Sequence, residues 1–156
     1  MSDIEKRLKE MGLSIPEAPA PVAAYVPGVR ADDYIYTSGQ IPLVNGEVKY
    51  KGKAGLDLPL EKAQEAAKIC ALNCLGVVKS FVGDLEKVEQ IVKVVGFVNS
   101  APDFTAQPQV VNGASELLGE LFGKKGAHAR SAVGVGSLPL DSACEIEMIV
   151  KVKKPN

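Results

Sequence analysis

The sequence has 156 residues and a formal net charge of −1 at pH 7. This length fits one domain with a buried core, and we expect a single domain over residues 1–156 with a short helical extension over about 1–13. The near-neutral charge argues against a nucleic-acid partner, because proteins that bind nucleic acids usually carry a basic patch. No apolar run reaches the roughly 18 residues of a membrane span, and the polar start MSDIEKRLKEMG lacks a secretory signal. The sequence therefore predicts a cytoplasmic protein.

The chain has three cysteines, Cys70, Cys74 and Cys144. An odd number without a secretion signal favours reduced thiols. Cys70 and Cys74 are four residues apart and would share one face of a helix, either as half of a metal site or as part of the core. Alanines and valines on the same face favour core packing. His128 is the only histidine, which argues against a multi-histidine metal site.

The first part of the chain predicts short elements. Residues 2–11 have the pattern of a short charged helix. Residues 14–30 hold four prolines and favour an extended, irregular segment, in which 21–26 is a candidate edge strand. Residues 34–37 have strand composition. An Asn-Gly pair between apolar residues predicts a hairpin over 44–48.

Longer elements follow. Apolar residues at i, i+3, i+4 and i+7 predict a helix over 60–82. The apolar, β-branched run over 90–98 predicts a strand that is covered on both faces. A second helix is expected from about 103 to 122. Strands over 131–135 and 143–152 complete the chain.

This order of elements predicts an α/β (α+β) fold. The simplest packing is one mixed sheet with two long helices on one face. Because the central strand is apolar throughout, the other sheet face also needs a cover. The chain has no element left to supply one, so we expect sheet faces to meet between subunits of a homo-oligomer.

Arg130 is a candidate ligand-binding residue. It stands immediately before the predicted strand 131–135, after a loop of small residues, where functional side chains often lie. Its guanidinium group is always charged, and its planar fork of donors matches a carboxylate in two hydrogen bonds. A surface or inter-subunit salt bridge is the alternative interpretation.

Two glutamates in the last strand form a second candidate. Alternation sends Cys144, Ile146 and Met148 to one face and leaves Glu145 and Glu147 together on the other. Like charges side by side are costly unless they are solvated, paired or used. A carboxylate here could accept a proton from water beside an electrophilic carbon. Pairing with basic residues or water is the other interpretation.

Smaller features lie near the N-terminal strands. Ser38 offers a hydroxyl and Gly39 allows close approach to the backbone. Tyr25 could cover a pocket with its amphipathic ring. Turn chemistry and packing explain these residues equally well. No base obviously activates Ser38, so we do not expect a serine nucleophile.

Taken in order, several segments resemble the YjgF/Rid family, which is also labelled endoribonuclease L-PSP. The segments that carry the resemblance are YVPG at 25–28, IYTSGQIP at 35–42, ARSAV at 129–133, Leu138-Pro139 and EIE at 145–147. They span roughly residues 20–152. The extra N-terminal helix and an insertion around Ala106–Val111 are similar to a longer subgroup of this family.

The resemblance implies a chorismate-mutase-like fold and a homotrimer with a central barrel and pockets between subunits. It also implies hydrolysis of reactive 2-imino or enamine acids to 2-oxo acids and ammonia. Arg130 would hold the substrate carboxylate, and Glu145 would position the attacking water. The other implied pocket residues are Tyr25, Ser38, Gly39, Asn112 and Ala132. No cofactor is expected, because the imine carbon is already electrophilic.

Three functions remain open from the sequence. The first is this cofactor-independent deamination. The second is binding of a small carboxylate-bearing metabolite at Arg130 without turnover. The third is an RNA-cleaving or translation-inhibiting activity, which the family label raises and the absence of a basic patch disfavours.

Overall fold

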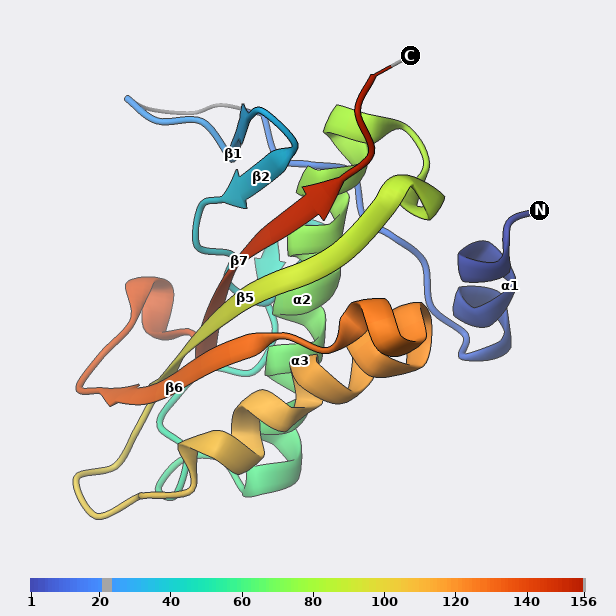
Figure 1. The fold of residues 1–156 in the computed structure, drawn as a ribbon. Coiled ribbons are helices and arrows are strands. Elements are labelled where there is room, and N and C mark those ends of the chain that lie inside the picture. Colours follow the sequence, from blue (N-terminus) through green and yellow to red (C-terminus); the bar gives the residue numbers. More distant parts are fainter. Residues whose placement is uncertain (21–23, 156) are drawn as a thin grey trace.

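The computed structural model describes residues 1–20 and 24–155. They form a mixed α+β fold with one five-stranded mixed sheet, in the order β1-β2-β7-β5-β6 (Figure 1). Its strands are β1 (Gly28–Ala31), β2 (Tyr34–Thr37), β5 (Val88–Asn99), β6 (Ala129–Val135) and β7 (Cys144–Val152). Strands β5 and β6 are parallel, and the other neighbours are antiparallel. The mixed sheet predicted from the order of elements is confirmed.

The predicted hairpin lies beside this sheet. Strands β3 (Leu43–Val44) and β4 (Glu47–Val48) pair in a separate two-stranded sheet. The turn residues Asn45 and Gly46 both have positive φ, 52° and 81°. Asn and Gly tolerate this conformation better than other residues, which is why the dipeptide predicted the turn correctly.

Two long helices cover one face of the sheet. Helix α2 (Leu60–Val82) and helix α3 (Gln107–Phe122) pack against each other. Figure 1 shows α2 behind β5 and β7, and α3 below β6. The alanines and cysteines from which α2 was predicted are buried. The buried side of α3 is made of leucines, valines, one alanine and one phenylalanine. The predicted two-helix layer is therefore confirmed. Within the ranges that the structure describes, no helix has both the length and the apolar character that crossing a membrane requires.

The predicted N-terminal helix is confirmed as α1 (Asp3–Glu10). It begins with a capping box, in which Ser2 Oγ accepts a hydrogen bond from the Glu5 amide at 3.2 Å and the Glu5 carboxylate accepts one from the Ser2 amide at 3.4 Å. Ile4 and Leu8 are buried. Arg7 Nη1 donates to the carbonyl oxygen of Leu121 at 2.6 Å, which fixes α1 against the end of α3.

The three cysteines lie between α2 and β7. Cys70 Sγ donates to the carbonyl oxygen of Cys144 at 3.5 Å, and Cys74 Sγ donates to that of Ile146 at 3.3 Å. Burial raises the pKa of the Cys70 thiol well above its ordinary value and that of Cys74 to about 12. All three side chains are buried, so the core-packing interpretation is confirmed.

Some predicted boundaries were wrong. Helix α3 begins at Gln107 and not near Asp103, because the chain turns before Ala106 and Pro108 occupies the first helical turn. Residues 106–111, where the resemblance suggests an insertion, form the N-cap and the start of this helix. In the proline-rich segment, 21–23 lies outside the described residues and 24–26 is not a strand. The strand there is β1, which starts directly after Pro27.

The sheet face opposite the helices carries apolar side chains. Val29 is 52% exposed, Tyr36 is 44% exposed and Val133 is 44% exposed. Phe97 and Ile149 are half-buried on the same face, where Phe97 pairs with Val133 and Ile149 pairs with Tyr36. An apolar surface that runs across several strands is typical of an interaction site.

Gly113 sets the distance between the two long helices. A Cβ atom there would overlap the backbone carbonyl oxygen of Gln64 on α2. We therefore expect Gly113→Ala to lower the free energy of unfolding by about 1–3 kcal/mol, as overpacking a core does. Gly119→Ala is the matched control on the same helix, because nothing lies within 4 Å of its Cβ position. Urea denaturation should show no loss for this control, and equal losses in both variants would contradict the steric explanation.

Candidate active site

The sequence predicted that Arg130 would stand just before a strand. In the structure it is the second residue of strand β6. It pairs with Val94 of β5, whose side chain is buried under the helices. Arg130 therefore points to the helix side of the sheet. Its Nη1 donates to Asn112 Oδ1 at 2.8 Å and to Ser115 Oγ at 3.1 Å, both on α3. The structure thus brings two predicted pocket residues, Arg130 and Asn112, into contact.

The Arg130 side chain borders a shallow cavity of about 390 Å³. The cavity is lined by Ser115, Gly119, Gly123, Gly126, Ala127, His128 and Arg130. Among the residues described, the single ion pair joins Lys151 and Glu89 at 3.9 Å, so no acidic side chain of the same chain neutralises this guanidinium group. The cavity beside Arg130 therefore suits an anionic ligand.

Four other predicted residues gather around a second cavity of about 420 Å³. Its lining includes Tyr25, Ser38, Gly39 and Glu145. Ser38 Oγ donates to the carbonyl oxygen of Val26 at 2.6 Å, which fastens the segment of Tyr25 to the end of β2. A Cβ atom at position 39 would overlap the Glu145 carboxylate. Gly39 is therefore required for the carboxylate to lie where it does.

Glu145 and Glu147 share one face of β7, as predicted. Their neighbours Cys144, Ile146 and Met148 are buried on the other face. Glu145 is half-buried, and its pKa is raised from the ordinary value, first by burial and then by the negative charge of Glu147. A carboxylate with a raised pKa is a stronger base than an ordinary glutamate, and it is better suited to take a proton from water.

Arg130 and Glu145 lie on opposite faces of the sheet. Arg130 contacts α3 on the helix side, whereas Glu145 pairs with Phe97 on the open side. Strand β5 stands between their two strands. One chain therefore keeps the candidate cation and the candidate base apart, and a site that uses both needs a second chain.

The remaining predicted residue, Ala132, follows Arg130 in β6. Its side chain packs against the core. Since β6 is an edge strand of the five-stranded sheet, one side of its main chain has no strand partner within that sheet. Main-chain groups near Ala132 are thus available to a ligand or to another subunit.

Sequence reasoning missed Ser115 and His128 as neighbours of Arg130. Ser115 Oγ lies 2.9 Å from His128 Nε2, and His128 Nδ1 lies 2.6 Å from the carbonyl oxygen of Gly126. Ser115 comes three residues after Asn112 on α3, and that spacing could have placed both on one helix face. His128 gave no such signal, because it lies between the short 3-10 helix Gly123–Gly126 and the start of β6, outside both elements.

The stability of the protein should report the raised pKa of Glu145. Its folded pKa lies above its unfolded one, so ionisation of Glu145 opposes folding. The stabilising contribution of the protonated Glu145 is fully present below the unfolded pKa, and it is lost as pH rises through the folded pKa. We expect Glu145→Gln to raise the melting temperature at pH 7–8 and to leave it unchanged near pH 3. Thermal denaturation at the two pH values measures this, and stabilisation of equal size at both would contradict the assignment.

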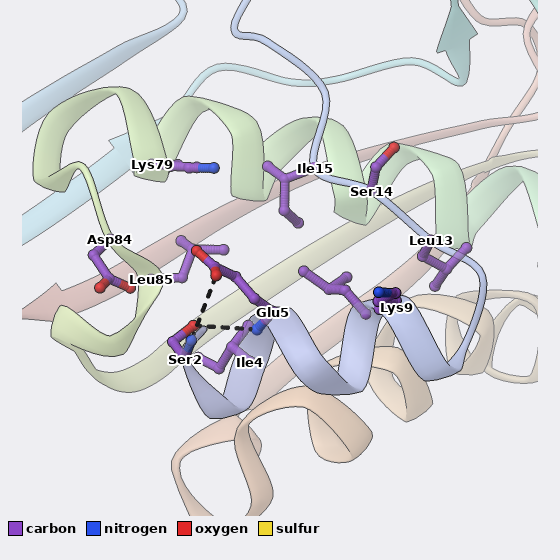
Figure 2. Close-up of a pocket in the computed structure, with 11 residues that line it drawn as sticks. Ser2, Ile4, Glu5, Lys9, Leu13, Ser14, Ile15, Lys79, Asp84 and Leu85 are labelled. Atoms are coloured by element: carbon purple, nitrogen blue, oxygen red, sulfur yellow. Dashed lines mark hydrogen bonds between the residues drawn. The ribbon is translucent and has the colours of Figure 1, made fainter.

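A further cavity of about 330 Å³ lies outside this region, between α1 and the end of α2 (Figure 2). Ile4, Leu8 and Leu85 provide buried apolar side chains, and Lys9 and Lys79 stand at the rim. Figure 2 shows the capping box of Ser2 and Glu5 at one end of it. None of the predicted site residues borders this cavity.

Comparison with known proteins identifies the family. A family model described as "YjgF/chorismate mutase-like, putative endoribonuclease" matches residues 5–152. The solved structure of Atu1372 from Agrobacterium tumefaciens, described as a protein of unknown function, is 43% identical with a TM-score of 0.92, over 97% of this chain and 93% of that one.

Two curated relatives extend the comparison. Protein TCP17 of Trypanosoma cruzi is 38% identical over 96% of this chain and 94% of its own length. A 2-iminobutanoate/2-iminopropanoate deaminase of Escherichia coli is 35% identical over 85% of this chain and 90% of its own. Both the family model and these relatives cover most of the fold described above, and the chain belongs to the YjgF/chorismate mutase-like family.

Proposed function

We propose that this protein hydrolyses reactive 2-imino or enamine acids to 2-oxo acids and ammonia, in pockets between the subunits of a homotrimer. The observation that carries the proposal is the guanidinium group of Arg130, which borders a cavity and forms no ion pair within the described part of its chain. The deaminase named among the relatives supports the reaction type.

The residues supply what the reaction requires. Arg130 binds the substrate carboxylate and so fixes the imine carbon in place. Glu145 takes a proton from water, and the resulting hydroxide adds to the imine carbon. The nitrogen of this adduct is protonated and leaves as ammonia, while the hydroxyl group becomes the carbonyl of the 2-oxo acid. Water is the only co-reactant, and no electrons are transferred.

The positions of these two residues support the proposed assembly. Arg130 and Glu145 lie on opposite sheet faces within one chain, and the open face is apolar and exposed. If open faces meet around a central barrel, an edge strand β6 of one chain approaches the Tyr25–Glu145 cavity of its neighbour. A closed ring also buries the apolar surface, which stabilises the oligomer.

The direct test is ammonia release in the presence of an enzyme that makes such imines. A pyridoxal-phosphate-dependent threonine or serine dehydratase is mixed with the protein, and free ammonia is followed over time. Acceleration that grows with protein concentration is expected. Lack of acceleration, together with binding of a 2-oxo acid, would favour a carboxylate-binding protein without turnover. Cleavage of RNA by the purified protein would contradict the proposal in favour of a ribonuclease.

A further inference from the structure

A hydrogen-bonded chain of side chains leads from Arg130 to the only histidine of the sequence. Arg130 Nη1 is 2.8 Å from Asn112 Oδ1 and 3.1 Å from Ser115 Oγ. Ser115 Oγ is 2.9 Å from His128 Nε2, and His128 Nδ1 is 2.6 Å from the carbonyl oxygen of Gly126. These contacts connect α3, the turn after it and β6.

The donor and acceptor inventory fixes the direction of each bond for a neutral imidazole. A carbonyl oxygen only accepts, so His128 Nδ1 carries the proton that is donated to Gly126. His128 Nε2 is then an acceptor and takes the hydroxyl proton of Ser115. This leaves the lone pairs of Ser115 Oγ to accept from Arg130. The histidine thereby keeps the serine hydroxyl turned so that it accepts from the guanidinium group.

These bonds use both hydrogens of one guanidinium nitrogen. Nη1 carries two, which go to Asn112 and Ser115. The hydrogens on Nε and Nη2 are the ones left for a ligand. Two-point binding across Nη1 and Nη2 is thus blocked, whereas two-point binding across Nε and Nη2 is open.

We infer that Ser115 and His128 are positioning residues that hold Arg130 so that a substrate carboxylate binds side-on, through Nε and Nη2. This inference rests on the proposed function, because it concerns how the same site takes its carboxylate. Neither residue has to touch the substrate. Ser115 acts on the guanidinium directly, and His128 acts on it through Ser115.

The test measures binding of 2-oxobutanoate, a 2-oxo acid of the proposed product class, by isothermal titration calorimetry. Ser115→Ala removes an acceptor of Nη1, and we expect it to raise Kd about 3- to 10-fold. His128→Ala should raise Kd by no more than Ser115→Ala does. The double variant should match Ser115→Ala alone, because His128 acts only through that hydroxyl. Ser137→Ala, on the exposed segment after β6, is the control and should bind like the wild type.

A pair of conservative variants keeps the test decisive if an alanine variant fails to fold. The side-chain amide of glutamine reaches the position of Nε2, whereas that of asparagine reaches only the position of Nδ1. We expect His128→Gln to bind 2-oxobutanoate within about 2-fold of wild type, and His128→Asn to resemble His128→Ala. A ¹⁵N NMR spectrum of the arginine side chains tests the same contact in the protein without ligand. The Nη1 hydrogens of Arg130 should exchange faster with water in Ser115→Ala than in wild type.

The outcomes separate the two proposals. Independent, multiplying effects of Ser115→Ala and His128→Ala on Kd would overturn the positioning role, as would equal binding by His128→Gln and His128→Asn. Normal ammonia release with either of these patterns would leave the proposed function standing. A wild-type protein that neither binds 2-oxobutanoate nor accelerates ammonia release would contradict both.

Discussion

Replacing Arg130 with alanine is expected to lower kcat/KM for imine hydrolysis by about 100-fold or more, which is the range found when one partner of a buried, hydrogen-bonded charge pair is removed. The substrate carboxylate would enter a half-buried site without a cation to balance it. Asn112 and Ser115 would lose their shared donor. The rate of ammonia release at several substrate concentrations measures the effect.

Arg130→Lys is the informative companion variant. It keeps the positive charge but loses the planar fork, so we expect activity between those of wild type and Arg130→Ala. Circular dichroism should show that both variants are folded, because the guanidinium group contributes no core packing. Full activity in Arg130→Ala would contradict the proposed function, which requires Arg130 to bind the substrate carboxylate.

Mixing two inactive variants is expected to restore activity. In the proposed homotrimer each pocket takes Arg130 from one chain and Glu145 from its neighbour. Chains carrying Arg130→Ala still supply a normal Glu145, and chains carrying Glu145→Gln still supply a normal Arg130. In a closed ring of three that contains both kinds of chain, about one third of the pockets should contain both native residues.

Co-expression of the two variants with different affinity tags provides the mixed oligomers. Two successive purifications select assemblies that contain both chains, and ammonia release is compared with that of each parent. Mixed oligomers made from wild-type chains with both tags are the control. A mixture no more active than its parents would show that one chain supplies both residues, against the arrangement on opposite sheet faces.

Much of the fold could be predicted because its patterns are local. The apolar stripe of α2, the alternation of β7 and the Asn-Gly hairpin each follow from spacing within one element. The start of α3 could not be read in this way, because the turn before Gln107 has no polar cap that would mark it. Strand β1 was missed because the prolines before Gly28 masked a short run that pairs only with its sequence neighbour β2.

The candidate site was only partly predictable for a related reason. Arg130 and Glu145 stood out because charged side chains interrupt otherwise apolar or small segments. Their placement on opposite faces of the sheet depends on the register of β5 with β6 and β7, which no single segment encodes. The contact between Ser115 and His128 likewise joins a helix to the turn that follows it, and it appears only when the chain is folded.

The burial of the three thiols makes this protein convenient to label. Cys70, Cys74 and Cys144 are all buried, and burial keeps Cys70 and Cys74 protonated near neutral pH. Since the thiolate is the nucleophile, maleimides and other alkylating probes should react with them slowly. A single cysteine introduced on the surface would then carry a spin or fluorescent probe without removal of any native cysteine, so that distances between neighbouring copies of the chain could be measured by spectroscopy.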